Sequence, residues 1–146
     1  MEFTPSDTIT IEVLINASTE QVWNAWTNPL IVLKWFGSDP NGKGLKAELD
    51  VRPGGRFEIT FENADRTQHT CFGVYTEVQR FNKLSFTWTW KSEPGVESFV
   101  TVLLAPVNNM TKVTFEHANV GTLSSHDYLA GWKRTFERLE QTLKQK

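Results

Sequence analysis

An alternation of apolar and polar residues recurs through the middle of the chain and limits the folds open to it. It is clearest in "KLSFTWTWK", where one parity is apolar and the other holds Ser, Thr and Lys; the apolar members are Leu84, Phe86, Trp88 and Trp90. A period of two places such side chains on one face of a strand. Comparable segments lie at 47–51, 57–61, 68–79, 97–107 and 110–120. Six consecutive strands with short turns predict an antiparallel meander with one apolar face.

The flanking regions predict one more strand and three helices. "TITIEVLINA" alternates like the central segments, and "STEQVWNAWTN" follows with Ser18 as N-cap and Gln21 as its capping-box partner. Pro29 interrupts this helix, and "LIVLKWFG" predicts a second short helix that stops at Gly37. The segment "SDPNGKG" predicts a loop, and residues 125–146 predict a long terminal helix.

Two details of the strands stay open. In 68–79, the inner face carries either Cys71 and Tyr75 or the residues of opposite parity, which are Phe72, Val74 and Val78. Gly73 in the same segment predicts a β-bulge.

The apolar face of the sheet needs a cover, and the terminal helix is the only segment long enough to provide it. We therefore expect an α+β fold in which a curved antiparallel sheet wraps around the C-terminal helix. Gly131 interrupts that helix beside Trp132. We expect Gly131 at the closest approach of helix and sheet and Trp132 in the wider space, the alternative being a glycine that faces solvent.

Length and charge restrict the class of protein. The 146 residues fit one domain, 1–146, and no apolar run reaches the roughly 18 residues that a membrane span needs. A net charge of −2 with dispersed Lys and Arg argues against nucleic acid as a partner. The polar start lacks a secretory signal, and the single Cys71 excludes an internal disulfide, so a cytoplasmic location is expected.

Four segments carry a family resemblance: "DVRPGGRF", "LSFTWTW", "TKVTFEH" and "GWKRTFERLEQTL". Together they resemble the stand-alone domain of the heat-shock-protein ATPase activator homologue family, in the START-like (SRPBCC) superfamily. The resemblance implies a helix-grip fold, in which a seven-stranded antiparallel sheet wraps around the C-terminal helix and leaves a cavity between them. The superfamily includes lipid carriers, hormone receptors and polyketide cyclases. In eukaryotic chaperone activators a separate N-terminal domain precedes this one. Only a short polar tail precedes residue 9 here, so we expect a role other than chaperone activation, although chaperone contact and a stress response remain possible implications.

The residues offer little support for other kinds of site. "SSHD" contains the residue types of a nucleophilic relay, but consecutive residues at a helix start cannot form one. Ser124 is instead expected to cap the terminal helix, and Asp127 to favour its N-terminal end. His69 and Cys71 are expected on the opposite wall from His117, which argues against a metal site. The strand carboxylates fall on the polar parity, and "DPNGKG" lacks the context of a phosphate-binding loop.

The inner wall is therefore the candidate site. Six Trp and ten Phe in this short chain are hard to pack without gaps, although a solid core is nearly as well supported. The candidate cavity residues are Trp35, Phe57, Ile59, His69, Phe86, Trp88, Trp90, His117, Tyr128 and Trp132. The leading hypothesis is binding of a small hydrophobic or aromatic ligand without a cofactor. One alternative is a cyclase- or hydrolase-like enzyme with His117 or His69 as general base and Tyr128 as donor, and another is a chaperone-associated interaction domain.

Overall fold

The structure is a computed structural model that describes residues 8–120 and 128–144. Seven strands and three helices follow one another along the chain. In order they are β1 (Thr8–Ile15), α1 (Thr19–Thr27), α2 (Pro29–Trp35), β2 (Lys43–Leu49), β3 (Arg56–Glu62), β4 (Gln68–Gln79), β5 (Lys83–Trp90), β6 (Glu97–Val107), β7 (Met110–Ala118) and α3 (Tyr128–Lys144).

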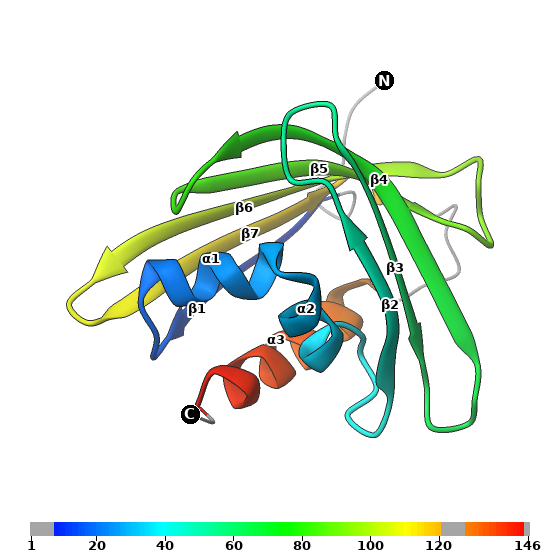
Figure 1. The fold of residues 1–146 in the computed structure, drawn as a ribbon, viewed down its shortest axis with the longest axis horizontal. Coiled ribbons are helices and arrows are strands. Elements are labelled where there is room, and N and C mark those ends of the chain that lie inside the picture. The colour runs from blue at the N-terminus through cyan, green and yellow to red at the C-terminus, as the bar shows by residue number, and fades with distance from the viewer. Residues whose placement is uncertain (1–7, 121–127, 145–146) are drawn as a thin grey trace.

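The strands form one antiparallel sheet in the order β1-β7-β6-β5-β4-β3-β2. Six of them are a meander, and β1 joins the far edge beside β7, with Ile9 opposite His117. The sheet is strongly curved, and the helices lie on its concave side (Figure 1). The predicted α+β helix-grip architecture, with two short helices between the first two strands, is confirmed.

Local sequence signals place the first two helices. The Ser18 backbone N–H donates to Gln21 Oε1 at 2.9 Å, and the Gln21 N–H donates to Ser18 Oγ at 3.1 Å, so the predicted capping box is present. Asn28 accepts from the N–H of Leu30 and so caps α2, which begins at Pro29. After Trp35 the chain leaves the helix, and Gly37 has a φ of +117°, a backbone conformation that favours glycine.

Two expectations need correction, and the open question of which face of β4 points inward is answered. The cover is not α3 alone, because α1 and α2 also lie over the concave face (Figure 1). In β4 the inner face carries Cys71 and Tyr75, whereas Phe72 is exposed. The register shift lies between Tyr75 and Glu77 rather than at Gly73. Gly73 is required for a different reason, since a Cβ there would lie 2.0 Å from the carbonyl oxygen of Thr87 on β5.

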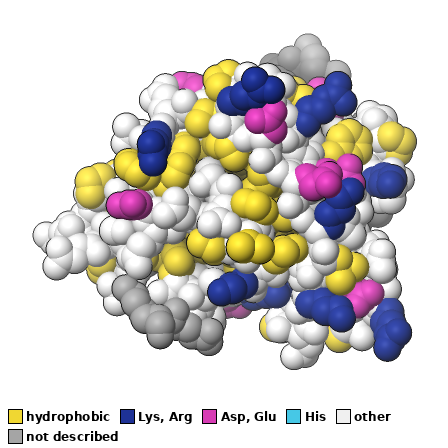
Figure 2. Space-filling model, viewed as in Figure 1, with side chains coloured by type: hydrophobic (Ala, Val, Ile, Leu, Met, Phe, Trp, Pro, Cys, Tyr) yellow, Lys and Arg dark blue, Asp and Glu magenta, His cyan; other side chains and the backbone are white. Residues whose placement is uncertain are grey.

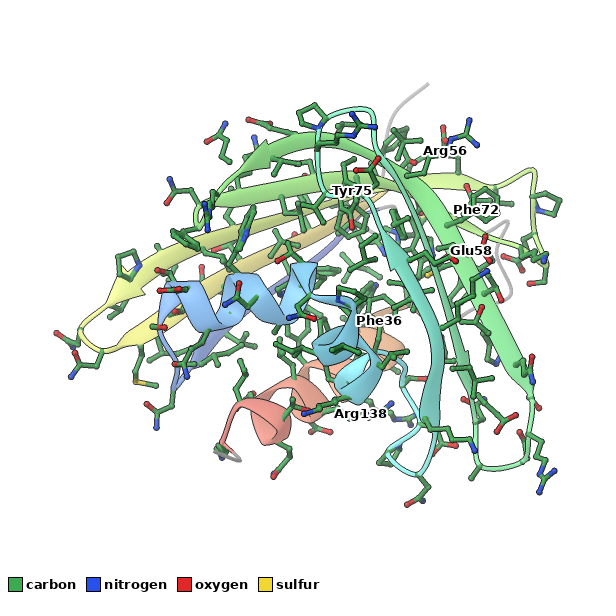
Figure 3. The ribbon with its side chains drawn as sticks, viewed as in Figure 1. Phe36, Arg56, Glu58, Phe72, Tyr75 and Arg138 are labelled. Carbon is green, nitrogen blue, oxygen red and sulfur yellow. The ribbon has the colours of Figure 1, made fainter. Side chains whose placement is uncertain are left out.

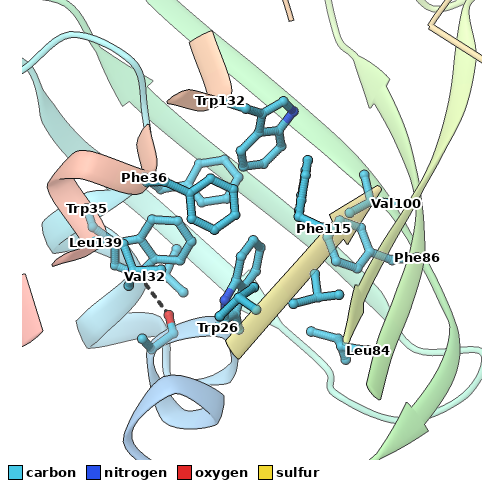
Figure 4. Packing of buried hydrophobic residues seen from close by; sticks show 14 of the residues in the cluster. Trp26, Val32, Trp35, Phe36, Leu84, Phe86, Val100, Phe115, Trp132 and Leu139 are labelled. Carbon is cyan, nitrogen blue, oxygen red and sulfur yellow. Dashed lines mark hydrogen bonds between the residues drawn. The ribbon is translucent and has the colours of Figure 1, made fainter. Parts of the chain in front are cut away.

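The helices and the sheet enclose a core rich in aromatic rings (Figure 4). The Trp26 and Trp35 rings meet at 4.8 Å between centroids, and Phe115 meets Trp132 at 4.4 Å. Trp35 is fully buried, and its indole N–H donates to the Ala25 carbonyl at 2.8 Å. The interior beneath α1 and α2 is therefore closely packed.

On the face seen in Figure 2, Lys and Arg are scattered among Asp and Glu, with apolar side chains between them. None of the helices that the structure describes combines the length and apolar character needed to cross a membrane.

Candidate ligand cavity

A cavity of about 260 Å³ lies where α3 begins, between that helix, the chain after α2 and the inner faces of β3, β4 and β5. Its lining residues are Phe36, Gly37, Ser38, Phe61, His69, Trp88, Trp90, Tyr128, Ala130, Gly131, Trp132, Arg134 and Thr135. Five of the ten candidate residues meet here: His69, Trp88, Trp90, Tyr128 and Trp132.

The other five candidates lie elsewhere. Four line a separate void of about 10 Å³ that is at most the size of one water molecule: Trp35, Phe57, Ile59 and Phe86. His117 is completely buried and is not among the residues that line the cavity. The parity of β3, β5 and β7 was read correctly, but it does not distinguish the open part of the interior from the filled part.

His117 is held in one protonation state by its neighbours. Its Nδ1 lies 2.9 Å from Trp132 Nε1, and because an indole nitrogen only donates, Nδ1 carries no proton. The proton is then on Nε2, which donates to Ser98 Oγ at 2.7 Å, and this hydroxyl donates onward to the Trp88 carbonyl at 3.3 Å. Burial lowers the pKa of His117 to about 3. The neutral imidazole thus links α3 to β7, β6 and β5.

Trp88 forms part of the cavity wall and is 2% exposed. Its indole Nε1 is buried, and no acceptor for its N–H lies within reach in residues 8–120 and 128–144. The ring itself is packed against Phe36 at 5.8 Å and Trp132 at 5.4 Å between centroids. The indole N–H is therefore a buried donor whose hydrogen-bonding capacity is unused within the described chain.

The chain after α2 forms one side of the cavity and is fastened from two directions. Arg138 on α3 donates to the Gly37 carbonyl at 3.0 Å and, at 3.4 Å, to the carbonyls of Phe36 and Lys34. Figure 3 labels Phe36 and Arg138 on these neighbouring segments. Burial lowers the pKa of this guanidinium, with Asp39 opposing the shift, and an arginine stays charged.

Asp39 supplies the second attachment. Its carboxylate accepts backbone N–H groups from Ala64 at 2.8 Å and Asn41 at 2.9 Å, and these bonds lower its pKa. The loop predicted for "SDPNGKG" is therefore tied to both α3 and the turn between β3 and β4.

The prediction for Gly131 is wrong. A Cβ built on this residue would meet only the Ser38 Cβ, at 3.8 Å, which is an ordinary van der Waals distance. Gly131 does not lie at a tight seam with the sheet; it lines the cavity across from the loop after α2. The missing side chain leaves space open and does not permit a close approach.

The cavity has an uneven distribution of charge. Among its described lining residues there is no Asp or Glu, and Arg134 is the only Lys or Arg. His69 contributes a further polar group, and its Nε2 lies 3.3 Å from Asn63 Nδ2.

Three other sites considered from the sequence can now be placed. The predicted cap of α3 by Ser124 and Asp127 falls outside the described residues. In the described part of the chain, no three His, Cys, Asp or Glu side chains come together as a metal site requires. The strand carboxylates are partly or fully exposed, and Glu58 pairs with Lys46 at 3.0 Å.

Sequence reasoning missed Phe61 on β3 and the residues that border the cavity on its helix and loop side. Phe61 shares the inward parity of Phe57 and Ile59 and could have been included for that reason. Small residues gave the other available signal, because Gly37, Ser38, Ala130 and Gly131 cluster at this end of the interior.

A curved antiparallel sheet around a C-terminal helix, with a cavity at one end, defines a helix-grip protein of the START-like class. The profile of the family described as "Activator of Hsp90 ATPase homolog 1-like protein" matches residues 16–144. The chain belongs to this family. No curated protein matches the sequence.

Solved structures share the fold at low sequence identity. A protein from Nitrosomonas europaea superposes with a TM-score of 0.82 at 23% identity, over 98% of this chain and 97% of that one. An AHSA1-like protein from Aeromonas hydrophila gives 0.79 at 23% identity, over 94% and 92%. DynU16, a protein in the dynemicin biosynthetic locus, gives 0.76 at 23% identity, over 97% of this chain and 48% of its own.

Proposed function

We propose that this protein binds a small, flat, largely apolar ligand in the cavity beside the start of α3. One observation carries the proposal: about 260 Å³ of space, open to solvent on one side, is bordered mainly by aromatic rings and two small residues of α3. An apolar cavity of roughly 150 Å³ is enough to hold benzene in another protein. The space here therefore suits a molecule of one or two fused rings.

The arrangement of the rings favours an aromatic ligand. Trp88 and Trp90 meet edge to face at 5.3 Å, and Phe61 meets Trp90 at 5.9 Å. Such a wall presents both ring faces and ring edges, which suit offset-stacked and edge-to-face contacts with another ring. A few polar groups, including His69 and Thr135, would then orient the ligand.

The proposal is tested by titration with N-phenyl-1-naphthylamine, a neutral dye that fluoresces in apolar surroundings. We expect saturable binding at one site with a dissociation constant in the micromolar range. Gly131→Leu should place a side chain in the cavity and weaken binding at least tenfold. Lys133→Leu adds the same side chain on an exposed position of α3 and should bind as the unaltered protein does. Equal binding by both variants, or no binding by any form, would contradict the proposal.

Catalysis in the same cavity has less support. A general base must be able to take up a proton near the working pH, whereas burial holds the pKa of His117 at about 3 and both its ring nitrogens have partners. His69, which lines the cavity, is then the base on which a cyclase or hydrolase would depend. Chaperone contact is suggested by the family description and by no feature of the cavity.

A further inference from the structure

The two edge strands of the sheet, β1 and β2, differ in how they are protected from pairing (Figure 1). An edge strand exposes backbone N–H and C=O groups that can pair with another strand, and proteins block such pairing with lysines, bulges or a covering element. From the contrast between the two edges, we propose that β1 pairs antiparallel with β1 of a second copy of this chain. Two sheets would then join into one.

Strand β2 has three features that oppose pairing. It contains Lys43 and Lys46, and its register shifts between Gly44 and Lys46. Helix α2 lies close against it, since a Cβ on Gly44 would be 2.6 Å from the Leu33 carbonyl oxygen. These features make β2 a poor partner for another strand.

Strand β1 lacks such features. All eight of its residues pair with β7 without a register shift, and none is Lys, Pro or Gly. Most of them are Thr, Ile or Val, which favour extended strands. Within residues 8–120 and 128–144, one backbone hydrogen bond joins β1 to a segment other than β7, from the Ala17 N–H to the Ile15 carbonyl at 2.8 Å. In this part of the chain, the outward backbone groups before Ile15 therefore have no backbone partner.

Apolar surface also remains at the β1 edge. Leu14, on the convex face, is 48% exposed. Ile9 and Val13, on the concave face, pack against the core but are only half-buried. Pairing with another strand would remove part of this apolar surface from water, which is favourable.

A second copy fits this edge because the concave face of β1 is complementary to itself. In an antiparallel pair about a two-fold axis at Ile11, the two Ile11 side chains lie opposite each other. Ile9 of each copy then lies opposite Val13 of the partner subunit. All of these cross-strand pairs are apolar, which stabilises the pairing.

The charges select the same register. Glu12 is the one charged residue of β1, and its carboxylate lies 3.6 Å from Lys112 Nζ on β7. With the axis at Ile11, each Glu12 lies opposite Thr10 of the partner subunit, so no two carboxylates are directly opposed. Moving the axis to Glu12 would set the two carboxylates against each other, which is unfavourable. Moving it to Thr10 would leave the end of β1 unpaired.

The dimer should be weak. Residues 8–14 extend over about 24 Å, and a single strand pair of this length buries less than the roughly 1,600 Å² of a standard interface. We expect a dissociation constant on the order of 100 μM. Because β1 supplies none of the described residues that line the cavity, association and ligand binding should be independent of each other.

Sedimentation equilibrium of the full chain, at loading concentrations from about 20 μM to about 1 mM, measures the association. Thr10→Lys should tighten it about threefold to tenfold at low salt, because the dimer gains two contacts between Lys and Glu12. Adding Glu12→Lys to this variant should reverse the gain, since each contact then joins two lysines. Glu116, which lies opposite Thr10 on β7, is unchanged in both variants, so the difference reports the contact with Glu12.

Asn82→Lys is the matched control. It adds the same charge at an exposed position in the turn between β4 and β5, away from β1, and should leave the association unchanged. Circular dichroism confirms that each variant is folded before the comparison is made.

A second measurement needs no variant. In ¹⁵N–¹H spectra of the unaltered protein, the amide signals of residues 8–14 should shift as the concentration rises from about 50 μM to about 1 mM. The amide signals of β2 should stay in place over the same range.

Tightening by Thr10→Lys, its reversal by Glu12→Lys and shifts confined to β1 and its neighbours would support the proposal. A protein that remains monomeric to about 1 mM, in the unaltered form and as Thr10→Lys, would overturn it and leave this edge to a strand of another protein. Association that Thr10→Lys does not change, or amide shifts that appear elsewhere and not in β1, would also overturn it, because the copies would then meet through another surface.

Discussion

The interior of this protein has two regions that aromatic rings line, one filled and one open. In the filled region, the Trp26 ring of α1 packs against Trp35 of α2 and against Phe115 and Phe136. In the open region, Trp88 and Trp90 face a cavity of about 260 Å³. The strands contribute aromatic rings to both regions, so the sheet does not account for the difference.

The helix side does account for it. Over the filled region α1 and α2 supply the indoles of Trp26 and Trp35, while over the cavity the chain supplies Gly37, Ser38, Ala130 and Gly131. Small residues opposite large rings leave volume that no side chain occupies. In this fold the helices and the loop after α2 determine where the cavity lies, while the strands determine its chemistry.

The largest expected effect is a loss of folding stability, and its size should differ between the filled and the open region. Trp35→Ala should lower the free energy of unfolding by about 4 kcal/mol, since it empties a fully enclosed site and removes the bond to Ala25. Trp90→Ala should cost about half as much, because one side of this ring already faces open space. Chemical denaturation of both variants provides the comparison. Equal losses would mean that the cavity is filled in solution.

Substitution of Arg138 should produce the next largest loss of stability. Arg138→Met removes hydrogen bonds to the carbonyls of Lys34, Phe36 and Gly37 and should cost about 2 kcal/mol. The same change at the exposed Lys133 should be within about 0.5 kcal/mol of neutral. Dye binding should also weaken in Arg138→Met, because the segment after α2 loses its attachment to α3. A loss of stability without an effect on binding would show that this segment does not shape the cavity.

His117 should make stability depend on pH. Its folded-state pKa of about 3 lies below the ordinary value of 6.5, so between these values the unfolded chain binds more protons. Stability is therefore highest above pH 6.5 and decreases as the pH falls toward 3. Between pH 6.5 and 5 this group should account for about 1.5 kcal/mol.

His117→Gln should abolish that part of the pH dependence while leaving the contribution of the carboxylates, which titrate mainly below this range. Urea denaturation at the two pH values measures the difference. An unchanged slope in the variant would mean that His117 is not buried in its neutral form.

Substitution of Gly131 should produce the smallest change in the free energy of unfolding, and this change should be stabilising. Gly131→Ala should stabilise the protein by about 0.5 kcal/mol, since the methyl group has room and alanine favours the helix. Gly73→Ala is the contrasting variant and should be strongly destabilising, because its Cβ would overlap the Thr87 carbonyl. Thermal unfolding of the pair checks both signs. A destabilised Gly131→Ala would mean that helix and sheet lie closer together than described.

The sequence predicted the fold well because its signals are local. The parity of β5 correctly placed Leu84, Phe86, Trp88 and Trp90 inside, and the capping box at Ser18 set the start of α1. Strand β4 could not be read in this way, because apolar residues stand on both of its faces and only pairing with β3 and β5 decides between them.

The cavity could be predicted only in part, because its limits depend on contacts between distant segments. Whether Trp88 or Trp35 faces open space depends on how far α1 and α2 extend over the sheet. The partners of His117 lie 19 and 15 residues away in the chain, at Ser98 and Trp132, and Arg138 reaches about 100 residues back to Gly37. No local pattern marks such contacts.

A crystal structure determined under xenon pressure tests the contrast between the filled and open regions most directly, since xenon enters apolar cavities that are large enough to hold it. The structure predicts xenon among Trp88, Trp90 and Gly131, and none in the small void beside Trp26, Trp35 and Tyr75. Xenon absent from the first place, with these side chains collapsed into the space, would contradict the presence of a ligand cavity.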